Sequence, residues 1–565
     1  MLRPIRYWCL GFLSVLAPAM LACAEDRAFD LVIRNGRIVD GTGNPWRWGD
    51  VGIRGSRIEA LGRIAPEVPA QRTIDATGRV VAPGFIDAHS HSDWVLFEDG
   101  DAPGKIRQGV TTEVLGEDRS VGPHRGKLAP KVVEVQGKST ELTSIYDYFG
   151  TLERSGVAVN VATYVGLGNV WRCVMGDSFD RPTPMQLDEM ATILEGAMQD
   201  GALGLSTMLA APQEMVATTD DLVFLGKVVA RHGGIFASHM RSEGLDVLRS
   251  IREVIEIGER ASVPVEITHL KIAEKTLWGR MSEIVGLIDE ARARGVDVQA
   301  NVYPYTRGNN DLVSILPPWV HEGDREALLA RLKDATLRDR MKREIREGLP
   351  GWYNHYLAVG GDWSRMLLSA NLTGRNDRFE GLTMDAILKI RSEGRAPQPD
   401  PLDEMFDFLL EEGGSISTIY AHHTEEDMNL ALLQPWCSVG SDGSALAIEG
   451  ALRRGHPHPR NFGTFPRVLG VYVRERHLLS LEDAIRKMTS LNASKLGLVD
   501  RGILRVGAMA DVTVFDPARV IDHSTYADPF HYNEGIEHVV VNGRIVLDGG
   551  SPTGERPGRA LRRGR

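Results

Sequence analysis

The chain has 565 residues, of which 42% are hydrophobic, and its 60 glycines and 28 prolines are typical of a globular protein with many loops. Its formal net charge of −11 argues against nucleic acid as a partner, because phosphate binding requires a basic face. Two of its four cysteines, Cys9 and Cys23, lie near the N-terminus. The other two, Cys173 and Cys437, are too few for a disulfide framework.

The first 24 residues have the pattern of a secretory signal peptide. Arg3 and Arg6 precede an apolar stretch over residues 7–21, and a small-x-small site follows it. This stretch is shorter than the roughly 20 residues that span a bilayer, and no other run is long and apolar enough, so no membrane span is expected. Lipid attachment at Cys23 is disfavoured because the preceding residues match a lipid-attachment box poorly. We expect an exported protein, periplasmic or secreted, with residues 1–24 removed.

The two ends of the remaining chain have similar β-rich patterns. Residues 29–82 contain short alternating strands with glycine turns, and the same pattern returns over 498–550. In the second segment Asn542-Gly543 separates two apolar runs, which is a strong signal for a hairpin. These patterns predict a small β-sandwich domain formed from both termini.

Residues 83–497 alternate strand patterns with amphipathic helices, such as those expected over 183–199, 242–260 and 282–294. This alternation predicts an α/β fold, specifically a (β/α)8 barrel. From about 320 to 400 the alternation of strand and helix patterns stops. We interpret this segment as an insertion over the barrel mouth and a possible lid. The arginine-rich tail over 556–565 is expected to be disordered.

The most informative segment ends in two histidines one residue apart, His89 and His91. They follow a short apolar strand pattern, and side chains at i and i+2 of a strand point to the same face. Both imidazoles can therefore reach one ion at the rim of a barrel, where catalytic residues gather.

Three further polar residues end strand patterns: His239, His269 and Asp442. A single histidine in such a place is more often a core residue, but four histidines and an aspartate at strand ends predict a metal site. Nitrogen and oxygen ligands suit zinc best, with other divalent transition metals as alternatives.

The order of these residues resembles that of the amidohydrolase superfamily, and several longer segments resemble the N-acyl-D-amino-acid deacylases (D-aminoacylases). The most specific is the run His456-Pro-His-Pro-Arg-Asn-Phe-Gly-Thr-Phe-Pro-Arg; Phe85-Ile-Asp-Ala-His-Ser-His, Ser238-His-Met-Arg and Thr268-His-Leu-Lys also match. The resemblance covers about residues 28–550. It implies a barrel that takes ligands from strands 1, 5, 6 and 8, and metal-dependent hydrolysis of N-acyl-D-amino acids to a carboxylate and a free D-amino acid.

The chain departs from the family pattern at the residue that bridges the metals. Many members have a cysteine after strand 2, and related amidohydrolases have a carboxylated lysine, but neither is evident here. The corresponding turn offers Glu117 or, less favourably, Asp118. A carboxylate can bridge two divalent ions, so the sequence leaves both one and two ions open.

The resemblance also implies roles around the substrate. We expect Asp442 to act as general base towards water and then as acid towards the departing amine. Lys271 lies two residues beyond His269 on the same strand face, and Arg460 can grip a carboxylate through two bonds, so both are expected to bind the substrate carboxylate. Tyr303 faces the barrel interior in a regular strand and can donate a hydrogen bond. The expected partner is a small acylated amino acid.

Two other functions remain alternatives at this point. One is hydrolysis of a cyclic amide, such as a hydantoin or dihydropyrimidine, or of a dipeptide-like amide. The other is a non-catalytic exported binding protein that keeps the barrel. The complete set of histidines and Asp442 disfavours the latter.

Overall fold

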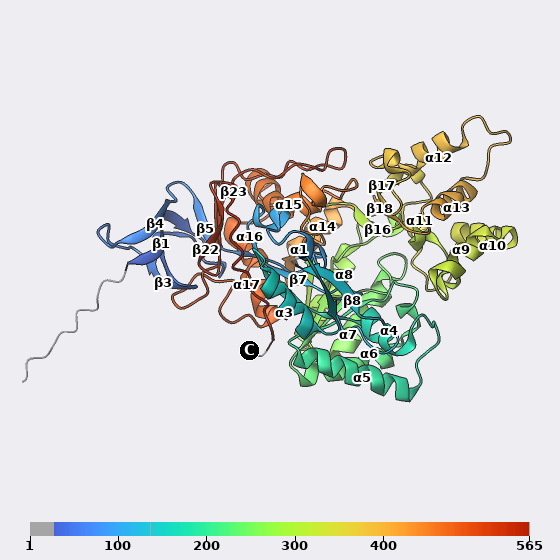
Figure 1. Cartoon of the computed structure of the whole chain (residues 1–565), viewed down its shortest axis with the longest axis horizontal. Helices are drawn as coiled ribbons and strands as arrows, with labels where there is room; N and C mark the ends of the chain where they lie inside the picture. The colour runs from blue at the N-terminus through green and yellow to red at the C-terminus, as the bar shows by residue number, and fades with distance from the viewer. Residues whose placement is uncertain (1–27, 136, 564–565) are drawn as a thin grey trace, which may run out of the picture.

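A computed structural model describes residues 28–135 and 137–563, so the predicted signal peptide over 1–24 lies outside the described residues. Three parts lie next to one another in Figure 1: the small β domain on the left, the barrel in the centre, and the insertion at the upper right. Within the described ranges, no helix has both the length and the apolar character needed to cross a bilayer.

The barrel consists of eight parallel strand positions within the described chain, occupied in sequence order. They are β6 (Phe85–Asp87), β7 (Val110–Leu115), β10 (Asn160–Thr163) continued by β11 (Val165–Gly166), β12 (Gly204–Met208), β13 (Ile235–His239), β14 (Val265–Ile267), β15 (Val298–Val302) and β19 (Cys437–Val439). A parallel bridge between Ser90 and Gly443 joins the ends of the first and last strands and closes the ring. The predicted (β/α)8 fold is confirmed.

Amphipathic helices cover the barrel: α3 (Ile145–Ser155), α4 (Leu167–Met175), α5 (Pro184–Gln199), α6 (Thr219–Arg231), α7 (Val247–Ala261), α8 (Met281–Ala293), α14 (Glu425–Leu432) and α16 (Leu481–Met488). Helix α5 begins where predicted because Thr183 and Gln186 form a reciprocal capping box. Helix α7 begins five residues later than the expected 242, and the loop that precedes it contributes to the site described below.

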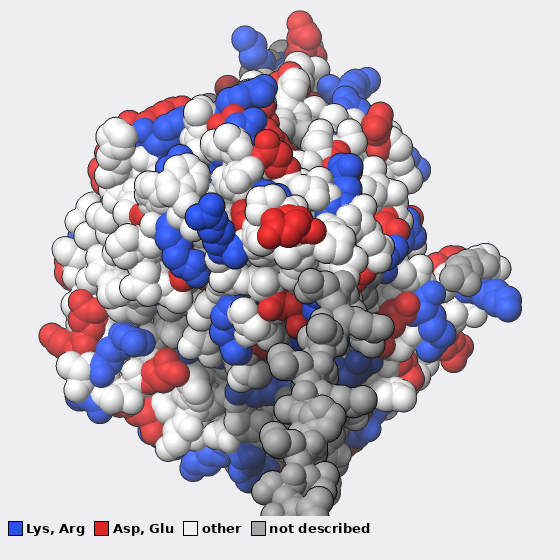
Figure 2. Space-filling model, turned by 90° about the vertical axis from the view of Figure 1, so that its left-hand side faces the viewer, with Lys and Arg blue, Asp and Glu red and all other residues white. Residues whose placement is uncertain are grey.

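The small β domain is built from both ends of the chain, as predicted. Its nine strands are β1 (Phe29–Ile38), β2 (Arg47–Arg54), β3 (Arg57–Gly62), β4 (Ala70–Asp75), β5 (Val80–Pro83), β20 (Val512–Phe515), β21 (Ile536–Val541), β22 (Arg544–Asp548) and β23 (Ser551–Pro552). Two hydrogen bonds join the start of β3, at one edge of the sheet, to the segment before β20. They run from Ile58 N to Ala508 O and from Ala510 N to Ser56 O. Basic and acidic side chains are interspersed on the outer face of this end (Figure 2).

The insertion is larger than the expected 320–400 and extends over 308–420. It contains an antiparallel sheet in the order β16 (Gly308–Asp311), β18 (Ile416–Tyr420) and β17 (Met366–Asn371). Five helices pack with it: α9 (Arg325–Lys333), α10 (Ala335–Glu347), α11 (His355–Ala358), α12 (Met384–Ser392) and α13 (Pro401–Glu411). Leu332, Met341 and Phe406 belong to a hydrophobic core separate from that of the barrel. The sequence pattern identified only the helical middle of the insertion, because the strands at its two ends resemble barrel strands in sequence.

The expected disorder of the tail over 556–565 is wrong for the described residues, which end at Arg563. This segment runs beside β10, where Val161 donates to Arg559 O and Leu561 donates to Val161 O. Arg556 forms ion pairs with Asp99 and Asp101, so several of its arginines act as partners of acidic groups. The prediction of disorder was based on charge composition alone. Composition carries no information about the acidic residues, distant in the sequence, that pair with these arginines.

Candidate metal centre and active site

The carboxylate of Glu117 lies between two pairs of histidines. Its Oε2 is 3.3 Å from Nε2 of both His89 and His91, and its Oε1 is 3.2 Å from His269 Nε2 and 3.4 Å from His239 Nδ1. The donor atoms form two groups that share this residue: His89, His91, Glu117 and Asp442 in one, and Glu117, His239 and His269 in the other. The structure thus brings all six sequence-predicted ligands together at the carboxyl ends of β6, β7, β13, β14 and β19.

The choice between Glu117 and Asp118 depends on the turn after β7. Asp118 adopts a left-handed backbone conformation with a φ of 53°, and its side chain points towards Arg119 at 3.8 Å. Glu117 faces the histidines, so it is the carboxylate that the geometry selects. The structure therefore places the Glu117 carboxylate between the two histidine pairs.

Asp442 is held against the histidine pair by the closure of the barrel. Its Oδ1 is 2.9 Å from His91 Nε2 and 3.4 Å from His89 Nε2, and its backbone N donates to His89 O at 2.8 Å. Both Asp442 and His269 have positive φ, 52° and 36°. Such conformations are strained in non-glycine residues and are retained where function requires them.

The electrostatics of the site favour bound cations. Burial disfavours the charged form of His91, yet Asp442 and Glu117 raise its pKa to about 10, and similar contacts raise the pKa of His89 to about 9. Burial also opposes ionisation of Glu117, but His89, His239 and His269 hold its pKa well below the usual range. The carboxylates thus provide buried negative charge at the point where the histidine nitrogens converge.

The donor set fits metal ions. Nε2 of His89 is buried and faces carboxylate oxygens of Glu117 at 3.3 Å and Asp442 at 3.4 Å, as expected of an atom that shares a metal with them. Imidazole nitrogens with carboxylate oxygens form a ligand set that zinc accepts, and the two oxygens of Glu117 face separate histidine pairs. Each of the two groups that share Glu117 would hold a divalent ion.

Glu243, which the sequence analysis did not identify, supports the second histidine pair. Its Oε1 is 3.0 Å from His269 Nδ1 and 2.5 Å from Lys271 Nζ, and the residue is 3% exposed. Burial works against its charge, but Lys271 and the histidines hold the pKa of Glu243 well below its usual range. Lys271 Nζ also lies 2.8 Å from His269 Nδ1, so Glu243 and Lys271 together hold the His269 ring with its Nε2 towards Glu117. Glu243 lies in the loop before α7, where no periodic pattern could have indicated its role.

A buried ionic cluster under the first histidine pair was also missed. Lys105, on the short helix α2 (Pro103–Ile106), is fully buried, and its Nζ donates to Asp87 Oδ2 at 2.7 Å, Ser441 Oγ at 2.9 Å and Gly443 O at 3.0 Å. Asp87 Oδ1 accepts from Ser441 N at 2.7 Å. These hydrogen bonds thus connect the segment after β6, which carries His89 and His91, to the segment after β19, which carries Asp442.

The three predicted substrate-binding residues lie together. Lys271 Nζ is 5.8 Å and Arg460 Cζ 5.0 Å from the centre of the Tyr303 ring. The hydroxyl of Tyr303 is buried without a partner among the described residues. Arg460, on α15 (Arg460–Arg467), also donates to Asp442 Oδ2 at 2.6 Å, a contact that the sequence did not predict.

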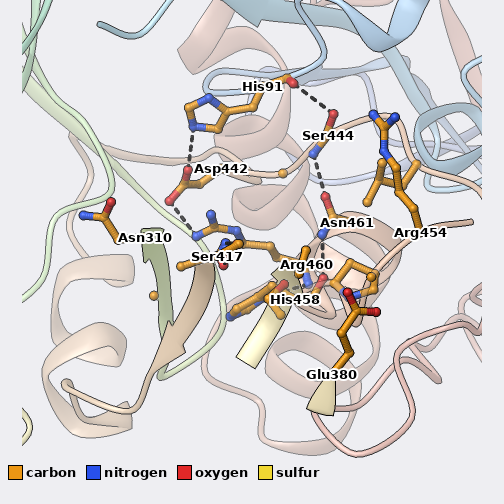
Figure 3. Close-up of a pocket in the computed structure, with 18 of the residues that line it drawn as sticks. His91, Asn310, Glu380, Ser417, Asp442, Ser444, Arg454, His458, Arg460 and Asn461 are labelled. Atoms are coloured by element: carbon orange, nitrogen blue, oxygen red, sulfur yellow. Dashed lines mark hydrogen bonds and ion pairs between the residues drawn. The ribbon is translucent and has the colours of Figure 1, made fainter. Parts of the chain in front are cut away.

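These residues line a cavity of about 1020 Å³ whose far wall comes from the insertion. Figure 3 shows Asp442, Arg460 and His91 around it together with Asn310 and Ser417 from the insertion. The insertion therefore contributes to the site.

Comparisons with known proteins agree with this geometry. The model of the Amidohydrolase family matches residues 72–299 and 448–547. The N-acyl-D-glutamate deacylase of Alcaligenes xylosoxydans is 36% identical over 537 residues, which cover 94% of this chain and 96% of that protein.

Two solved structures are also similar. The crystal structure of N-acyl-D-glutamate deacylase from Bordetella bronchiseptica, complexed with zinc and a phosphonate mimic of the tetrahedral intermediate, superposes with a TM-score of 0.78 at 31% identity and covers 95% of this chain and 100% of that one. A structure of D-aminoacylase, concerned with its binuclear metal centre, has a TM-score of 0.77 at 33% identity with the same coverage. The chain belongs to the amidohydrolase superfamily and, within it, to the N-acyl-D-amino-acid deacylase (D-aminoacylase) family.

Proposed function

We propose that the protein is a zinc-dependent hydrolase that cleaves the linear amide bond of N-acyl-D-amino acids, releasing a carboxylate and a free D-amino acid. The observation that carries this proposal is the position of Glu117 between two histidine pairs, beside Asp442 and at the base of the cavity. Similarity to deacylases over nearly the whole chain supports the substrate class.

Metal binding and proton transfer would be carried out by different side chains of the site. His89, His91, Glu117, His239, His269 and Asp442 would hold the zinc. Bound zinc supplies a Lewis acid that polarises the amide carbonyl and lowers the pKa of water. Asp442 would accept the proton of the attacking water and then deliver it to the nitrogen of the departing amine. Glu243 and Lys271, both in contact with Nδ1, would hold the His269 ring in the orientation that presents Nε2 to the metal.

The free carboxylate of the substrate requires a partner once it leaves water. Lys271 and Arg460 flank Tyr303 at the cavity and would form ion pairs with the substrate carboxylate. The hydroxyl of Tyr303, which has no partner among the described residues, would donate a hydrogen bond to the substrate. Arg460 has five N–H donors, so its bond to Asp442 leaves others for the substrate. This pairing would orient the scissile amide relative to Asp442.

The test is a hydrolysis panel with zinc-loaded enzyme. It contains paired N-acetyl-D- and N-acetyl-L-amino acids, a hydantoin and dihydrouracil, with the metal measured by elemental analysis. We expect zinc in the protein and release of D-amino acids alone. Preferential opening of the cyclic substrates would reverse the assignment, and an enzyme that holds no zinc and hydrolyses nothing would favour a binding protein.

We further propose that the protein acts after export. The support is the pattern of residues 1–24, with a basic start, a short apolar stretch and a small-x-small site.

A further inference from the structure

Two adjacent histidines, His422 and His423, follow strand β18 of the insertion. Both are buried, and His422 lines the cavity. Nε2 of His423 is 2.8 Å from the backbone oxygen of Tyr305, and Nδ1 of His423 is 3.0 Å from Nδ1 of His422. Burial lowers the pKa of His423 to about 3 and holds the pKa of His422 well below its usual range, so both rings are neutral.

These two contacts determine which ring nitrogens carry protons. A carbonyl oxygen only accepts, so His423 has its proton on Nε2 and a lone pair on Nδ1. Nδ1 of His422 must therefore be the donor in the contact between the two rings. Because a neutral imidazole has a single N–H, Nε2 of His422 is left as a hydrogen-bond acceptor.

This acceptor lies beside the hydroxyl of Tyr303. A Cβ added at Gly308 would lie 2.9 Å from His422 Nε2 and 3.4 Å from the Tyr303 hydroxyl oxygen, so both atoms border the same space, and all three residues line the cavity. Among the described residues, Nε2 of His422 has no hydrogen-bond partner. His458, on the same cavity in Figure 3, differs because its Nε2 donates to a backbone oxygen and its Nδ1 accepts from Arg460 N.

We propose that Nε2 of His422 accepts the hydrogen bond of the substrate's amide N–H, so that the enzyme selects amides that carry this hydrogen. The inference rests on the proposed function, which places the substrate carboxylate beside Tyr303. In an N-acyl amino acid the carboxylate and the amide nitrogen are bonded to the same carbon, so the groups that bind them must be neighbours. Of the groups that all these substrates share, only the amide N–H donates, because the carboxylate and the acyl oxygen only accept. A neutral acceptor beside Tyr303 therefore matches the amide N–H.

An ester of the same shape tests this directly, because an oxygen atom replaces the N–H. We compare N-acetyl-D-alanine with O-acetyl-D-lactate in the zinc-loaded wild type and in His422→Phe, which keeps a ring and removes the acceptor. The variant should lose at least about fivefold in kcat/KM for the amide, whose N–H is left unpaired, and less than about twofold for the ester. If the ester is hydrolysed too slowly, its inhibition constant replaces kcat/KM.

Equal losses for amide and ester, or no loss for the amide, would overturn the inference and leave the deacylase function intact. A wild-type enzyme that hydrolyses no N-acetyl-D-amino acid would refute the proposed function itself. His422→Gln can present its amide oxygen in place of Nε2, so it should recover part of the amide rate. The control His232→Phe lies after α6, at the opposite end of β13 from His239, and should keep the amide-to-ester ratio of the wild type.

The position of the proton is measured independently of activity by ¹⁵N NMR of wild-type protein labelled at histidine. The signals of His422 are assigned by their loss in either His422 variant. We expect the proton of His422 on Nδ1 and the proton of His423 on Nε2. A proton on Nε2 of His422 would overturn the inference whatever the kinetics, because that nitrogen could then only donate.

Discussion

Glu243 offers the sharpest test of how the second histidine pair is held. Its Oε1 lies 3.0 Å from His269 Nδ1 and 2.5 Å from Lys271 Nζ. Glu243→Ala removes both contacts and leaves the Lys271 ammonium, 6% exposed, without its carboxylate. Loss of a carboxylate that orients a metal-bound histidine typically weakens metal binding about 10–100-fold. We therefore expect the zinc Kd to rise by that factor, or about 1.4–2.7 kcal/mol.

Glu243→Gln separates the two contacts. The amide keeps the shape of the side chain and its contacts with His269 and Lys271, whereas the negative charge that pairs with Lys271 is lost. Zinc affinity should therefore fall less than in the alanine variant, while KM for the acylated amino acid rises because Lys271 loses its anchor.

Zinc Kd is measured by competition with a chelator, and the integrity of the fold by circular dichroism. Glu259→Ala, an exposed change on α7, is the control. A correctly folded Glu243→Ala variant that binds zinc within about twofold of the wild type, with unchanged kcat/KM, would refute the proposed role, because that role requires a change of about tenfold or more.

Four further outcomes are expected. Asp442→Asn should lower kcat by about 10²–10⁴-fold because an amide cannot accept the proton of water, and a variant that keeps more than about a tenth of the rate would place the base elsewhere. Glu117→Ala should lower zinc content and activity together, and Glu117→Cys should recover part of the zinc because thiolate is a strong ligand. Asp118→Asn should retain the metal. Equal losses of zinc at both positions would contradict the assignment of Glu117 as the shared ligand. Lys105→Met should lower the free energy of unfolding in urea by about 3–5 kcal/mol, because it leaves a buried carboxylate unpaired, and an unchanged midpoint would argue against the cluster. N-terminal sequencing of mature protein from the native host should begin near Glu25, whereas cytosolic protein that retains its first residue would exclude export.

Much of the fold follows from local patterns that the sequence carries by itself. The i, i+2 spacing of His89 and His91 after an apolar strand predicted one shared site, and their donor atoms do converge there, although β6 ends at Asp87. Helix α5 and the Asn542-Gly543 turn between β21 and β22 likewise formed where the sequence predicted them. These features depend on a few neighbouring residues, so a short window of sequence contains the information.

Tertiary structure alone decided which distant groups meet. His91 and Asp442 are 351 positions apart, and the contact between their side chains exists because the last barrel strand closes on the first. The turn at Asp118 selects Glu117 as the carboxylate between the histidines, and Glu243 reaches His269 from a loop with no periodic signal. Arg556 and its neighbours are ordered for the same reason, since acidic groups and strand edges elsewhere in the chain satisfy them. Periodicity records whether a residue is buried, whereas the identity of its partner depends on how the whole chain packs.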